Sequence, residues 1–279
     1  MRALKKVFYA LTDSLRELVI VTELALPNFR RRGTTPEIPV IASLTTYPPR
    51  IGLAWLAIET LLRQSVRPRK LILVLSEDEF PQKIVPRRIQ QQSRRGLEIL
   101  WVARNGRSYD KLIPVRQRYP GETIVTFDDD KFFHRTLLEE LYLASVQNPG
   151  SVIGSRGWII PTDGTEIHYG ANWVRATPGE RGRNLFTPGG NGCLYPPGSL
   201  DSTCENLDLA LAICPTADDI WFWFATQRTG SPTVCLGLKP HRSIRSQEGT
   251  PALSAINITK NDDQFQQMLK RFPRDVNFV

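Results

Sequence analysis

Short apolar runs alternate with helical patterns through the first half of the chain. Runs rich in β-branched and other apolar residues predict buried strands at 40–44, 70–75, 97–102 and 123–127. Helices are predicted between them at 53–62, 86–95 and 110–118, and another over about 137–144, which Asn148-Pro149-Gly150 ends. Strands that alternate with helices form a mostly parallel sheet flanked by helices, so the predicted fold class is α/β.

After residue 150 the regular alternation fades. Strands are predicted at 152–155, 158–160 and 233–238, a helix capped by Thr216 that contains 220–224, and a terminal helical turn or two at 264–269. A Gly/Pro-rich stretch, 187–198, lies between them. We therefore expect one domain over 36–279, with a nucleotide-binding half at about 38–150 and an irregular substrate-binding half at about 151–270.

The sequence of residues 1–35 predicts a separate amphipathic helix at the amino terminus. Leu4, Phe8, Leu11, Leu15 and Leu18 recur in steps of four and three and share one helix face. The apolar run 18–26 contains Glu23 and is too short to cross a bilayer. Three roles stay open: a helix on an anionic membrane surface, a helix packed on its own domain, or a coiled-coil dimer seam.

Composition and charge limit which classes of molecule we expect the protein to bind. The 279 residues are 41% apolar and 23% charged, as in a folded globular protein, and the net charge is +8. Residues 1–33 hold seven Lys or Arg against three acids, which favours an anionic membrane as a partner. No nucleic-acid-binding signature accompanies the charge, so nucleic acid is not expected. Four cysteines without a CxxC pair suit a reduced compartment. We expect a cytoplasmic protein that the helix could hold at the inner face of the membrane.

The tripeptide Asp128-Asp129-Asp130 directly follows the predicted strand 123–127. In an open α/β sheet, ligands bind at the carboxyl ends of the strands. Three adjacent carboxylates concentrate negative charge there, and Mg²⁺ or Mn²⁺ prefers oxygen ligands. The alternative is that one aspartate caps the next turn while the others are solvated. We favour a divalent cation.

Six segments in order resemble bacterial glycosyltransferases of the GT-A fold, which are Rossmann-like transferases that use nucleotide-diphosphate sugars and a DxD motif. The segments are Ser43–Ile51, Leu73–Pro81, Tyr109–Pro114, Val125–Asp130, Gly189–Pro197 and Ala217–Trp221. The resemblance covers about 38–270. The chain departs from it at Phe132-Phe133-His134, where the family often has a proline or aromatic stretch such as "YP".

The resemblance implies a nucleotide-sugar donor, most often a uridine diphosphate sugar, with Mn²⁺ or Mg²⁺. By position, Thr45, Tyr47 and Arg50 would border the base and ribose, and Glu77 would bind the base. Lys111 would approach the nucleotide or its phosphates. Asp130 would ligate the metal, while Asp128 and Asp129 would serve the ribose or metal side. His241 follows the last strand and is a further candidate metal ligand, although a lone histidine is more often structural. Gly190 and Gly192 either form a hairpin turn or let the backbone approach a sugar or phosphate.

Asp218 and Asp219 have two interpretations. With Thr216 they resemble a helix-capping pair, because acids in a first turn favour the helix dipole. Alternatively one of them, Asp219 before Asp218, is the general base that deprotonates an acceptor hydroxyl. The predicted function is sugar transfer to a hydroxyl of a glycan or lipid-linked acceptor. The alternatives are nucleotidyl transfer to a sugar phosphate, whose Gly-rich loop after the first strand is missing, and a non-enzymatic membrane-surface module.

Overall fold

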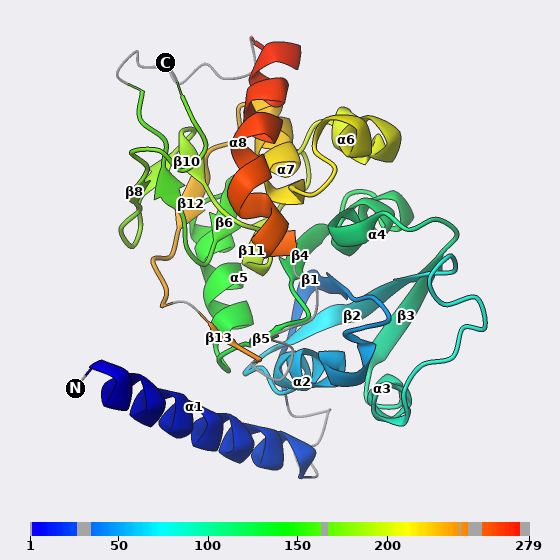
Figure 1. Ribbon diagram of the computed structural model, residues 1–279. Coiled ribbons are helices and arrows are strands. Elements are labelled where there is room, and N and C mark those ends of the chain that lie inside the picture. The colour runs from blue at the N-terminus through cyan, green and yellow to red at the C-terminus, as the bar shows by residue number, and fades with distance from the viewer. Residues whose placement is uncertain (1, 27–34, 163–166, 240, 245–252, 274–279) are drawn as a thin grey trace.

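The structure is a computed structural model that describes the backbone of residues 2–26, 35–162, 167–239, 241–244 and 253–273 (Figure 1). Side chains are described from Ser14 onward in the first of these ranges and from Lys260 onward in the last. The predictions for Leu4, Phe8 and Leu11 therefore lie outside the described side chains.

Four parallel strands build the front half of the sheet. Their order is β3 (Leu97–Val102), β2 (Arg67–Ser76), β1 (Glu37–Thr45) and β4 (Thr123–Phe127). The connections are α2 (Ile51–Leu62), α3 (Arg87–Ser93), and the 3-10 helix η2 (Arg107–Lys111) followed by α4 (Ile113–Arg118). The four strands and their helices lie where the apolar pattern predicts them.

The back half continues the same sheet. After β4 come β11 (Asn191–Tyr195), β6 (Val152–Gly154), β12 (Thr233–Cys235) and β9 (Arg181–Gly182). Only β11 and β9 run against the direction of the other strands of this eight-stranded sheet. The predicted fold class, a mostly parallel α/β sheet flanked by helices, is confirmed.

Two smaller sheets and five further helices belong to the rest of the domain. The sheets pair β5 (Lys131–Phe132) with β13 (Arg242–Ser243), and join β10 (Leu185–Phe186), β7 (Trp158–Ile159) and β8 (Val174–Arg175). The helices are α5 (Leu137–Gln147), η3 (Ser202–Glu205), α6 (Leu207–Ile213), α7 (Asp218–Thr229) and α8 (Leu253–Arg271). The sequence predicted neither β11 nor α6, and α8 is much longer than the predicted turn at 264–269.

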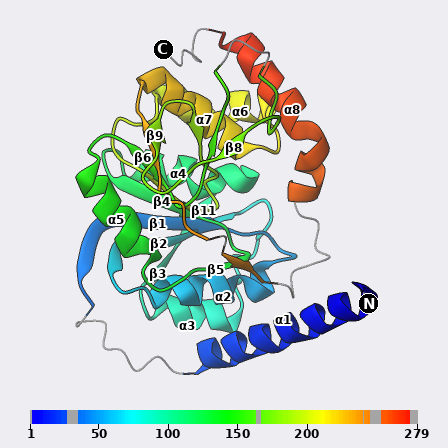
Figure 2. The same cartoon turned by 90° about the vertical axis from the view of Figure 1, so that its left-hand side faces the viewer.

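The sheet is buried on both faces because alternate strand residues point to opposite sides. In β1, Val40, Ala42 and Leu44 pack in one core with α2 and α5, while Ile41 packs in a second core with α4, α7 and α8. Figure 2 shows α2 and α3 on one side of the strands, and α4, α7 and α8 on the other. This double cover explains why the strands read as continuous apolar runs.

Helix α1 (Arg2–Ala25) lies outside these layers, with its carboxyl-terminal end against α2 (Figures 1 and 2). Leu24 joins the α2 core, and Ile20 and Val21 pack beside it. Leu15 and Leu18, from the predicted apolar face, are each 62% exposed. The helix therefore packs on the domain through another face, and the partner of the predicted apolar face stays open. Among the described residues, no helix has the length and apolarity needed to span a bilayer.

Candidate active site

The ends of β1 and β4 are joined by a clamp around Asp129. Leu44 and Phe127 are partners in the parallel register, so the residues that follow them meet at the carboxyl edge of the sheet. Thr46 donates a hydrogen bond to Asp129, and Arg50 Nη1 lies 3.1 Å from Asp129 Oδ1. Burial raises the pKa of Asp129 to about 6, while Arg50 and Thr46 oppose that rise. Through these contacts Asp129, which is only 5% exposed, connects the ends of the two strands.

Lys111 joins two acidic segments that are far apart in sequence. Its Nζ lies 3.0 Å from Asp128 Oδ1 and 3.0 Å from Asp218 Oδ2, and the residue is only 3% exposed. Burial alone would lower the lysine pKa, but the surrounding carboxylates raise it well above its ordinary value. Burial likewise disfavours ionised Asp128, yet the positive charges of Lys111 and Lys131 lower its pKa overall. Lys111 is thus a buried charge that its carboxylate partners balance, and losing them would be costly.

Asp219 lies beside Lys111, Asp128 and Asp218, and its carboxylate contacts the Gly/Pro-rich segment 187–198. Its Oδ1 accepts a 2.8 Å hydrogen bond from the Gly189 N–H. Burial raises the pKa of Asp219 to about 7, and neighbouring Asp218 adds to the rise. A carboxyl group that titrates near neutrality is suited to proton transfer.

The predicted cap by Thr216 is wrong. Ala217 occupies the N-cap position of α7, with no side-chain cap. Thr216 instead exchanges hydrogen bonds with Gln264 of α8, at 3.0 Å through its N–H and 2.9 Å through its hydroxyl. Asp219 is engaged by Gly189 rather than by the first turn of its own helix, so capping does not account for its orientation.

Gly190 and Gly192 have different roles in the 187–198 segment, and Gly190 is the one that lets it approach the acids. The Asp128 N–H donates to the Gly190 carbonyl at 2.9 Å, and a Cβ on Gly190 would lie 1.7 Å from Asp128 Oδ2. Gly192 serves a different purpose. It has φ +95°, and a Cβ there would meet Leu141 at 3.2 Å and Phe127 at 3.3 Å, so it allows α5 to pack on the sheet. The structure brings Gly190, but not Gly192, against the acidic cluster.

The remaining base- and ribose-side candidates lie at or just after the ends of β1 and β2. Thr45 Oγ1 donates to the Val74 carbonyl at 2.9 Å. The Tyr47 ring lies 5.7 Å from the Arg50 guanidinium carbon. Glu77 follows β2 and forms an exposed 2.7 Å ion pair with Lys83.

The carboxylates offer hard oxygen ligands, but they are paired with bases in this structure. Asp130 Oδ2 lies 3.3 Å from Arg50 Nη1, and its Oδ1 lies 2.9 Å from Lys131 Nζ. Asp130 Oδ1 is buried and accepts no well-oriented hydrogen bond, so this oxygen is available to coordinate a cation. Within the described residues, no group of three or more His, Cys, Asp or Glu is arranged to hold a metal.

His241 is held by the backbone. Its Nε2 lies 2.9 Å from the Asn191 carbonyl oxygen, and its ring stacks on His134 with centroids 5.4 Å apart. Burial lowers the pKa of His241 to about 4, so the neutral ring donates through Nε2. Only Nδ1 then remains for a metal.

Sequence reasoning missed Arg156, which follows β6. Its carbonyl accepts from Thr187 Oγ1 at 2.8 Å, and its guanidinium lies 5.4 Å from the Trp158 ring centroid. Burial lowers the pKa of Arg156, as does the charge of Arg175, although Asp219 and Asp128 attract it. Its Nε is buried and has no hydrogen-bond partner among the described residues. An isolated arginine in a Ser-Arg-Gly segment carries no motif that could have identified it.

No family model matches the chain, and no curated protein matches it. Among solved structures, S. aureus TarS 1-349 is similar at 12% identity with a TM-score of 0.46, covering 86% of this chain and 76% of that chain. The same fragment in complex with UDP gives 11% identity and a TM-score of 0.46, covering 86% and 74%. A crystal structure of TarS gives 11% and 0.44, covering 73% and 36%. Likeness at this level identifies neither a family nor an activity.

Proposed function

We propose that the protein is a metal-dependent glycosyltransferase that moves a sugar from a nucleotide-diphosphate donor, a UDP-sugar in the first instance, to a hydroxyl of a glycan or lipid-linked acceptor. The observation that carries the proposal is the convergence of Lys111, Asp128, Asp218 and Asp219 at the carboxyl edge of the sheet. These residues come from η2, the loop after β4 and the start of α7. In α/β sheets this edge is where ligands bind.

Asp219 is the proposed general base. It would take the proton of the acceptor hydroxyl as that oxygen attacks the sugar carbon, and its charge would offset the positive character of the sugar ring in the transition state. The Gly189 N–H fixes the orientation of the carboxylate, and Asp218 helps to raise its pKa to about 7. At neutral pH a substantial fraction of Asp219 is ionised and able to accept a proton.

Lys111 acts in this proposal as a positioning residue. At 3% exposure it has little surface to offer a nucleotide, and its ammonium group already holds Asp128 and Asp218. It keeps the donor-side acid and the acid beside the base at fixed positions. Such pre-organisation lowers the cost of assembling the transition state.

Asp128 and Asp130 are the residues that would hold Mn²⁺ or Mg²⁺, with His241 Nδ1 as a further candidate. Their side chains are 38% and 23% exposed, so a ligand can reach both. A bound divalent cation would supply positive charge to the departing diphosphate.

The test is a panel of nucleotide sugars assayed for donor hydrolysis and transfer, with wild type beside Asp219→Asn. Loss of a general base should lower kcat by about 10²–10⁴ while donor affinity persists. Because the carboxylate is a base only when ionised, wild-type kcat should rise with pH through about 7, and Asp219→Asn should lose that rise. Normal kcat in a correctly folded variant would remove Asp219 from the mechanism.

A further inference from the structure

Helix α1 has a second apolar face that the domain leaves uncovered. Leu15 and Leu18 are each 62% exposed, Val19 is 65% exposed and Leu26 is 60% exposed. On the packed side, Glu17 and Leu24 are only 8% and 9% exposed. Positions 15, 18 and 19 fall on one side of α1, and Leu26 follows directly after the last residue of the helix, Ala25. We call these four residues the outer strip.

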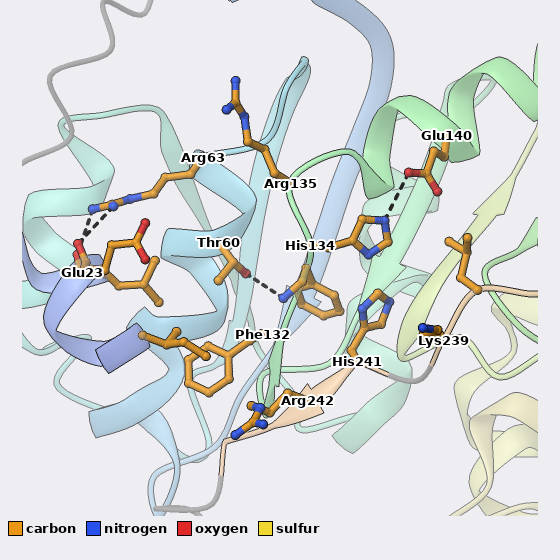
Figure 3. A pocket seen from close by; sticks show the side chains of 14 residues that line it. Glu23, Thr60, Arg63, Phe132, His134, Arg135, Glu140, Lys239, His241 and Arg242 are labelled. Carbon is orange, nitrogen blue, oxygen red and sulfur yellow. Dashed lines mark hydrogen bonds and ion pairs between the residues drawn. The ribbon is translucent and has the colours of Figure 1, made fainter. Parts of the chain in front are cut away.

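A cavity of about 780 Å³ lies between the carboxyl-terminal part of α1 and the segments around β5 and β13, and Figure 3 shows the side chains that line it. Its apolar wall comes from Ile20 and Leu24 of α1, Phe132 and Phe133 around β5, and Leu238 before β13. Figure 3 shows basic side chains around this wall, with His134 and His241 facing each other between them. An apolar wall with a basic border suits a ligand that has both a hydrophobic part and an anionic group.

Two of the basic residues at the cavity border have no acidic partner among the described residues. Arg135 and Lys239 are exposed and form no ion pair with any residue that the structure describes. Arg63, in contrast, is paired with Glu59 and bonded to backbone carbonyls of the α1 end. Of the two acids in the lining, Glu140 accepts a hydrogen bond from Thr136 at 2.6 Å and lies 3.4 Å from His134, and Glu23 is exposed. Four Lys or Arg residues line the cavity against these two acids, so its border is positively charged overall.

We propose that α1 lies in the plane of an anionic membrane with its outer strip in the lipid, and that the basic border of the cavity contacts anionic lipid headgroups around the helix. Arg135 and Lys239 would supply these contacts. A second copy of α1 suits the strip less well, because residues 1–33 carry seven bases against three acids and paired helices would repel. This proposal does not depend on the transferase activity.

The experiment is flotation of the full-length protein with two kinds of vesicle, neutral phosphatidylcholine and phosphatidylcholine mixed with phosphatidylglycerol. Binding is expected to the mixed vesicles only and to weaken as salt increases. Leu15→Glu with Leu18→Glu should weaken binding by about tenfold or more for each leucine, because each loses its burial in lipid. Both side chains are exposed, so the melting temperature should not change.

The cavity border is tested separately by Arg135→Gln with Lys239→Gln. Two basic contacts are expected to be worth about thirtyfold in binding to the anionic vesicles. The matched control is Arg118→Gln with Lys270→Gln, which removes the same residue types from exposed positions of α4 and α8, across the molecule from α1 (Figure 1). Binding of the control should stay within about twofold of wild type, because distant charges are screened.

Four results would overturn the proposal. One is wild-type protein that ignores anionic vesicles at low salt. Another is a border variant that binds like its control. The third is an outer-strip variant that turns a dimer into a monomer without affecting flotation, which would assign the strip to a second copy. Thermal stabilisation by inorganic phosphate without vesicle binding would also reject a membrane lipid in favour of a free anion.

Discussion

At the residue scale, Gly190 offers a sharp test of the site, because its missing side chain is what admits Asp128. A Cβ there would lie within 2.3 Å of three atoms of the Asp128 carboxyl group. Gly190→Ala should therefore displace that carboxylate from Lys111 and lower activity by about tenfold or more, the scale set by misplacing a reacting group. Gly52→Ala is the control, since nothing lies within 4 Å of its Cβ and it sits within α2. Replacing this helical glycine should stabilise the fold by roughly 0.5–1 kcal/mol.

Both variants would be compared by thermal unfolding and by turnover. Equal loss of activity in the two would show that Gly190 has no special relation to the site. Loss of stability in Gly190→Ala alone, with activity retained, would show that the backbone at Gly190 moves and the Asp128 carboxylate stays in place.

The positions of Asp128, Asp218 and Asp219 follow from features that a sequence displays, whereas Lys111 is indicated only by the resemblance. Acids directly after a predicted strand must lie at one sheet edge, and an acid pair at the start of a helix is visible from its position. The contacts of Thr46 and Arg156 could not be predicted in the same way. Thr46 meets Asp129 across 83 positions of sequence, and only the pairing of β1 with β4 creates that contact.

At the element scale, the docking of α1 depends on Arg63 at the end of α2. Its guanidinium donates to the carbonyls of Glu23 at 3.1 Å, Leu24 at 2.9 Å and Leu26 at 2.8 Å, while Nε pairs with Glu59 at 2.7 Å. The end of a helix leaves carbonyls that need such donors. Lysine cannot present this planar fork, so Arg63→Lys should loosen α1 and destabilise the protein by about 1–3 kcal/mol.

The measurement for Arg63→Lys is urea unfolding together with limited proteolysis of α1. Arg69→Lys is the matched control, because Arg69 makes only an exposed ion pair with Glu122. It should leave both readouts near wild type. If Arg63→Lys behaves the same way, the contacts between α1 and the domain come from Leu24 and its apolar neighbours alone.

The elements that the sequence failed to predict share a physical cause. Strand β11 lies in a Gly/Pro-rich segment that reads as a loop, yet it is buried throughout because β4 and β6 pair with it on both sides. Local propensity is overridden there by tertiary pairing. Short pairings such as β5 with β13 span 112 positions between Lys131 and Ser243 and carry no local signal of their own. The long parallel strands were predictable because burial on both faces makes them continuously apolar.

At the scale of the whole molecule, β11 makes one body of the two halves. It lies between β4 of the front half and β6 of the back half, so the main sheet is continuous across the boundary near residue 150. The acidic cluster spans the same boundary, since Asp128 comes from the front and Asp219 from the back. A ligand bound there would stabilise both halves together, and unfolding should occur as one transition.

The metal proposal can be tested on that transition. Mn²⁺ with UDP at about 100 times the dissociation constant should stabilise the native state by about 2.7 kcal/mol and raise the melting temperature by about 5 °C. Asp130→Asn removes a charged ligand but little volume, so it should keep the fold while losing the Mn²⁺-dependent part of the shift. Asp263→Asn, at an exposed position of α8, is the matched control and should keep the whole shift. Asp130 would be excluded as a ligand if its variant showed the wild-type response to Mn²⁺, because a metal site cannot lose an anionic ligand without losing affinity.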